Sequence, residues 1–85
     1  MAKLLIIDDD PDIRALLKEA LKKSGHETKT AESGKTGLEA VDREIPDLIL
    51  LDLMMPVMNG YGFLDHLGSR EIKPSIPVVI LTALN

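Results

Sequence analysis

Apolar residues form short, unbroken runs at positions 4–7, 48–51 and 78–81. Such runs, bounded by polar residues, are typical of strands buried on both faces, as in a parallel sheet that helices cover. Residues 27–31 are more polar and have the composition of a short edge strand. The pattern therefore predicts four strands.

A helix is predicted between the first two strands. Asp10 is a good N-cap, Pro11 suits the first helical position, and Gly25 is a typical residue after a helix end. Apolar residues recur between them at the spacing of one helical face: Ile13, Leu16, Leu17, Ala20 and Leu21.

Two further helices complete the pattern. Ser33 can cap a helix that carries Leu38 and Val41 and ends near Ile45, and a shorter helix is expected over about residues 62–67. The order βαβαβαβ indicates the α/β class, with a parallel sheet, right-handed crossovers and helices on both faces. Residues 1–85 are expected to form a single domain.

Composition and charge narrow the function. A net charge of -4 and the absence of a Lys/Arg stripe argue against direct nucleic-acid binding. No apolar run is long enough to span a membrane, and the first residues lack the features of a signal peptide. The chain has no cysteine, which fits a reducing compartment, so a cytoplasmic protein is the simplest interpretation.

Acidic residues follow two of the buried strands. Asp8 and Asp9 come directly after the first strand, and Asp52 directly follows the third. These strands are neighbours in a doubly wound sheet, and ligands bind beyond their carboxyl ends. Converging carboxylates need a raised pKa or a bound cation, and an oxygen-only ligand set favours Mg²⁺. The alternative is that the acids only end strands and cap helices, as Asp10 is expected to do.

Three segments together resemble the response-regulator receiver domain of two-component signalling. They are LIIDDDPDIR at residues 5–14, LILLDLMMPVMNG at residues 48–60 and PVVILTA at residues 77–83. The resemblance covers essentially the whole chain. It implies a flavodoxin-like (CheY-like) doubly wound parallel sheet with the strand order 2-1-3-4.

The same resemblance implies a role for each matching residue. Asp52 would accept a phosphoryl group from a sensor histidine kinase, a phosphotransfer protein or a small phosphodonor. Asp9, Asp52 and the backbone carbonyl of Met54 would ligate Mg²⁺, with Asp8 acting through bound water. Thr82 would contact the phosphoryl group. The chain would not be an enzyme, but a phosphoacceptor that assists its own phosphorylation.

The family's domain continues with a helix, a strand that bears a lysine, and a final helix, whereas this sequence stops at Asn85. We therefore expect a truncated receiver domain that retains Mg²⁺ binding but is phosphorylated slowly and is impaired in switching. Strand 78–81 would be left as an apolar edge, which favours a homo-oligomer formed through this strand or by exchange of elements between chains.

Two alternatives remain open from the sequence. The first is a non-catalytic receiver-fold fragment that acts as a self-associating interaction or assembly module. The second is a hydrolase of the haloacid-dehalogenase type, because Asp8 and Asp10 form an Asp-x-Asp pair after the first strand. Pro11 and Asp12 do not continue that family's motif, and it assigns no role to the loop after Asp52.

Overall fold

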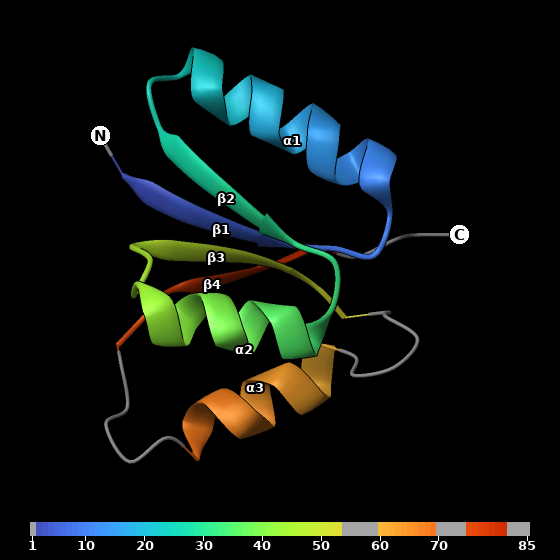
Figure 1. Cartoon of the computed structure of the whole chain (residues 1–85), viewed down its shortest axis with the longest axis vertical. Coiled ribbons are helices and arrows are strands. Elements are labelled where there is room, and N and C mark those ends of the chain that lie inside the picture. The colour runs from blue at the N-terminus through green and yellow to red at the C-terminus, as the bar shows by residue number, and fades with distance from the viewer. Residues whose placement is uncertain (1, 54–59, 70–74, 82–85) are drawn as a thin grey trace.

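A four-stranded parallel sheet lies at the centre of the structure, a computed structural model that describes residues 2–53, 60–69 and 75–81. The strands are β1 (Lys3–Ile7), β2 (Glu27–Ala31), β3 (Leu48–Asp52) and β4 (Val78–Leu81). The helices are α1 (Pro11–Lys23), α2 (Gly34–Arg43) and α3 (Gly60–Gly68). Helix α1 covers one face of the sheet, and α2 and α3 cover the other (Figure 1).

The strands lie in the order β2-β1-β3-β4, and every neighbouring pair is parallel. This confirms the predicted doubly wound α/β fold and its 2-1-3-4 order. The chain moves outward from β1 to β2 and then returns to place β3 on the other side of β1. The strand order therefore reverses between β1 and β3, which is where open α/β sheets bind ligands.

The main core fills the space between the sheet and the α2/α3 layer. Phe63 from α3 is fully buried there, together with Ile7, Ile49 and Leu51 from the two central strands. Helix α1 is much less enclosed: none of its residues is buried, and Leu16 is 65% exposed. The apolar face predicted for this helix exists, but it is only partly covered by the described residues.

Local signals explain where the first two helices begin. The Asp10 side chain accepts hydrogen bonds from the amides of Asp12 and Ile13 at the start of α1. After the helix end, Gly25 adopts φ 85°, a left-handed conformation that favours glycine. Ser33 and Thr36 form a capping box at the start of α2.

Two predicted helix bounds were wrong by about two residues. Helix α2 ends at Arg43 rather than near Ile45, because Glu44 is already extended two residues before Pro46. Helix α3 begins at Gly60 instead of residue 62.

No helix in the described ranges is long and apolar enough to cross a membrane.

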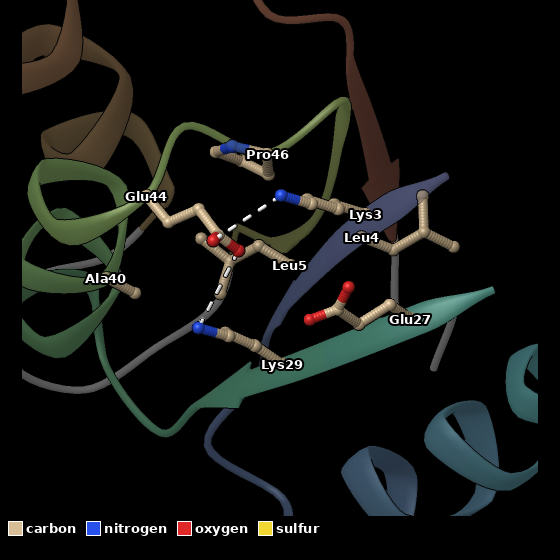
Figure 2. Close-up of a pocket in the computed structure, with 8 residues that line it drawn as sticks. All are labelled: Lys3, Leu4, Leu5, Glu27, Lys29, Ala40, Glu44 and Pro46. Carbon is tan, nitrogen blue, oxygen red and sulfur yellow. Dashed lines mark ion pairs between the residues drawn. The ribbon is translucent and has the colours of Figure 1, made fainter. Parts of the chain in front are cut away.

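Ion pairs connect the segment after α2 to strands β1 and β2, toward the amino-terminal end of the sheet (Figure 2). Glu44, just after α2, lies 3.5 Å from the Lys3 ammonium and 3.7 Å from that of Lys29. These side chains are about half exposed, so each ion pair contributes little stability. They line a hollow about the size of one water molecule, which is too small for an organic ligand.

Gly37 allows α2 to approach β1 closely, and we expect Gly37→Ala to destabilise the fold by about 1–3 kcal/mol. A Cβ atom at this position would lie 2.6 Å from Ile7 Cδ1 and 3.2 Å from Phe63 Cε1. Both neighbours are fully buried and have little room to move. Urea unfolding measures the change. Gly68→Ala is the matched control, because a Cβ there meets nothing within 4 Å. Equal stability of Gly37→Ala and the wild type would contradict this account of the packing.

Candidate metal centre

Three aspartates meet at the carboxyl ends of β1 and β3. One carboxylate oxygen each from Asp8, Asp9 and Asp52 can be chosen so that all three lie within 4.8 Å of one another. The cause is the strand register, in which Ile7 pairs with Leu51, so that the next residue along each strand is an aspartate. The structure thus brings together the three acids that the sequence places at strand ends.

The cluster lies partly inside the protein. Asp8 is 6% exposed and Asp52 is 9% exposed, whereas Asp9 is open to solvent. Carboxylates of this kind are costly to bury as anions unless protons, hydrogen bonds or a cation compensate them. The pocket therefore has one solvent-facing side and two buried acids behind it.

Hydrogen bonds hold Asp8 in place. Its amide donates to the Ala31 carbonyl oxygen at 3.1 Å, which continues the β1–β2 pairing beyond the strand end. Its Oδ1 accepts a hydrogen bond from the Asp10 amide at 2.9 Å. Its carbonyl oxygen accepts one from Arg14 Nη1 at 2.7 Å. Sequence reasoning missed Arg14, because a hydrogen bond to a backbone carbonyl leaves no pattern of side chains in the sequence. The one signal that could have pointed to it is a basic residue one turn into the helix that follows the acids.

Burial raises the pKa of the Asp8 carboxyl above its ordinary value, because desolvation disfavours the charged form. The hydrogen bond from the Asp10 amide acts in the opposite direction, since it favours the carboxylate. The negative charges of Asp52, Asp9 and Asp10 raise the pKa further. The folded protein therefore brings these charges together at an electrostatic cost, which a cation would relieve.

The donor set and its spacing fit Mg²⁺. Two oxygens bound to one octahedral Mg²⁺ lie about 2.9–4.2 Å apart, given metal–oxygen distances of about 2.1 Å. The separations of up to 4.8 Å in the cluster are slightly wider. Small side-chain movements, or a water molecule between the ion and one acid, would close that difference. Mg²⁺ usually keeps several waters and binds one or two carboxylates directly.

Asp10 does not belong to this cluster. Its Oδ1 accepts hydrogen bonds from the amides of Asp12 and Ile13, so its carboxylate caps α1. This is the capping role expected from the sequence. It also argues against the haloacid-dehalogenase interpretation, which rests on Asp8 and Asp10 acting as a pair.

Two of the predicted site residues lie outside the described residues. They are Met54, whose carbonyl is expected to ligate Mg²⁺, and Thr82, which is expected to contact the phosphoryl group. Their roles therefore stay predictions. The site described by the structure consists of Asp8, Asp9 and Asp52, with Arg14 behind the loop that carries the first two.

The fold and the acidic cluster together define an open α/β protein with an oxygen-rich pocket at its topological switch point. The chain belongs to the response regulator receiver domain family, whose sequence pattern it matches over residues 4–85. It is thus a receiver domain of the kind found in two-component response regulators.

Sequence relatives agree with this assignment. The chain is 39% identical over 83 residues to a probable transcriptional regulator, ycf27, of Porphyridium aerugineum, covering 98% of this chain and 33% of that protein. It is 42% identical over 82 residues to the transcriptional regulatory protein GlrR of Escherichia coli, covering 96% of this chain and 18% of that protein. The chain thus spans a third or less of the length of these curated relatives.

Solved structures share the fold. The N-terminal domain of a response regulator receiver protein from Methanoculleus marisnigri superposes with a TM-score of 0.94 at 37% identity, covering 99% of this chain and 68% of that one. The chemotaxis protein CheY4 of Vibrio cholerae superposes with a TM-score of 0.91 at 32% identity, covering all of this chain and 71% of that one.

In the absence of divalent cations, Asp8→Asn should stabilise the protein at neutral pH. The folded-state pKa of Asp8 lies above its ordinary value of 3.8, so the folded state binds more protons than the unfolded state between those two values. The stability of the wild type therefore falls as pH rises through that window. Asparagine removes the charge and keeps an oxygen that can accept the Asp10 amide hydrogen bond.

Thermal unfolding in EDTA across the acidic range measures this effect, with the exposed Asp65→Asn as control. The stabilisation by Asp8→Asn should disappear near and below the ordinary pKa, where Asp8 is protonated in both states. A variant that is less stable than the wild type at neutral pH would contradict the electrostatic account.

Proposed function

We propose that residues 1–85 form a receiver domain that is phosphorylated on Asp52 with the help of Mg²⁺. The observation that carries the proposal is the convergence of Asp8, Asp9 and Asp52 at the switch point of the sheet. Membership of the receiver family supports it, since that family works in two-component signalling.

Each acid has a distinct task in this proposal. Asp9 and Asp52 would ligate Mg²⁺ directly together with the Met54 carbonyl, and the more buried Asp8 would act through a bound water. The bound metal would supply positive charge to offset the charge that builds up on the phosphoryl oxygens during transfer. Positioning and charge neutralisation are most of what phosphoryl transfer requires, so few other protein groups are needed.

Asp52 is the nucleophile. One of its carboxylate oxygens forms a bond to the donor's phosphorus as the bond from phosphorus to the leaving group breaks, which gives an acyl phosphate. Thr82 then contacts a phosphoryl oxygen. The donor is the phosphohistidine of a sensor kinase or phosphotransfer protein, or a small phosphodonor. The domain promotes its own modification and turns over no separate substrate, so we class it as a phosphoacceptor rather than an enzyme.

Intact mass measurement after incubation with acetyl phosphate and Mg²⁺ tests the proposal. The wild type should gain one phosphoryl group, and Asp52→Asn should gain none, because the amide is not a competent nucleophile. Asp65→Asn removes an exposed carboxylate on α3 and should be modified like the wild type. Omitting Mg²⁺ should lower the yield.

Fragmentation of the modified chain locates the phosphoryl group. An adduct on Asp8 would contradict the proposal and favour the dehalogenase-type hydrolase. No adduct on the wild type, with Mg²⁺ present, would favour the non-catalytic assembly module instead.

We further propose self-association through β4, either edge to edge or by exchange of elements between chains. Strand β4 is the edge of the described sheet, and its Val79 and Ile80 are 46% and 38% exposed. Apolar edge strands favour pairing with another chain.

Ile80→Lys should therefore reduce self-association, because a charge on an edge strand opposes pairing. Sedimentation velocity over a concentration series measures the associated fraction. Ile45→Lys adds the same charge at an exposed apolar residue away from β4 and serves as the control. A wild type that stays monomeric at the highest concentration would contradict the proposal.

A further inference from the structure

Arg14 connects helix α1 to the loop that carries two of the three clustered acids. Its Nη1 donates to the carbonyl oxygen of Asp8 at 2.7 Å, and its own backbone amide donates to the Asp10 carbonyl at 3.1 Å. The side chain is half-buried, although most of α1 is exposed. The guanidinium thus reaches back over the start of its own helix to the end of β1.

The carbonyl that Arg14 binds belongs to the peptide group between Asp8 and Asp9. A peptide group is planar, so holding its oxygen restricts the plane that carries the Asp9 Cα atom and limits the positions that the Asp9 side chain can reach. The Asp8 side of this peptide is already held, by the Ala31 carbonyl and the Asp10 amide. Arg14 adds a hydrogen bond to the carbonyl oxygen of this peptide.

Asp9 depends on this arrangement more than its neighbour does. Its side chain is exposed, and no group within residues 2–53, 60–69 and 75–81 donates a hydrogen bond to its carboxylate. The position of that carboxylate is therefore set by the backbone on which it stands.

We propose that Arg14 is a positioning residue for the metal pocket, holding the peptide between Asp8 and Asp9 so that both acids face Asp52 before a cation binds. The inference rests on the proposed function in one respect, namely that the pocket binds Mg²⁺. Replacing a group that orients metal ligands typically lowers metal affinity by about 10- to 100-fold.

The positive charge of Arg14 and its hydrogen bond to Asp8 have opposite effects on Mg²⁺ affinity. One substitution can therefore distinguish the two roles. A guanidinium beside the pocket repels Mg²⁺, so deleting it would tighten binding if charge were its only effect. Deleting it weakens binding if its hydrogen bond positions the ligands. The two roles therefore predict opposite signs for the same substitution.

The experiment compares Mg²⁺ affinity of the wild type, Arg14→Gln and Arg14→Lys by calorimetric titration at fixed ionic strength. Arg14→Gln should weaken binding by about tenfold. Arg14→Lys keeps the charge and one donor group and should restore part of the affinity, but it lacks the planar fork of arginine. Lys18→Gln removes the same charge one turn further along α1 and should leave the affinity nearly unchanged. Tighter binding by Arg14→Gln would overturn the proposal.

A second measurement needs no metal. The Asp10 amide donates a hydrogen bond to Asp8 Oδ1, so its hydrogen-exchange rate in the presence of EDTA reports how firmly the loop is held. The exchange rate of the Ile6 amide in β1 serves as the reference for changes in global stability. Arg14→Gln should speed exchange at Asp10, and Lys18→Gln should not. Unchanged exchange in Arg14→Gln would overturn the positioning role. If the wild type binds no Mg²⁺, the proposed function fails, and the exchange result alone decides whether Arg14 positions the loop.

Discussion

The parallel pairing of β1 with β3 is the constraint on which the candidate site depends. Ile7 and Leu51 are paired and fully buried, and each is followed directly by an aspartate. A register shift of one residue would turn the side chains of the shifted strand to the opposite face of the sheet, so that Ile7 or Leu51 would leave the core cluster that contains Phe63. Packing of this core therefore favours the observed register, and the register places Asp8 and Asp52 side by side.

This arrangement makes the protein hold together charges that repel one another. The raised pKa of Asp8 results from its burial and from the neighbouring acids, with the Asp10 amide compensating in part. The opposite end of the sheet differs, because there the Glu44 carboxylate lies near the ammonium groups of Lys3 and Lys29, so the charges attract one another. Among the described residues, buried acids and an opening to solvent come together at the carboxyl end, and a divalent cation requires this combination.

Much of the fold could be predicted from the sequence because its signals are local. Apolar runs mark the strands, Asp10 and Ser33 mark helix starts, and the alternation of elements implies a doubly wound sheet. The end of α2 was placed too late, because the proline signal acts on Ile45, whereas the backbone is already extended at Glu44, where no local sequence signal marks the change.

The candidate site could also be predicted from the sequence in part. The three acids could be found because strand ends converge at one edge of a parallel sheet. Arg14 could not, since its contact is with a backbone carbonyl and depends on how α1 leaves the loop. The high exposure of Leu16 was equally hidden, because periodicity reveals an apolar face but not what covers it.

The central claim is that this cluster is a specific Mg²⁺ site, and a titration followed by backbone amide chemical shifts tests it most directly. The account predicts saturable shifts concentrated at Asp8, Asp9 and Asp52, and their loss in Asp9→Asn. Shifts that do not saturate, or that spread evenly over exposed acids such as Glu19 and Asp65, would contradict it.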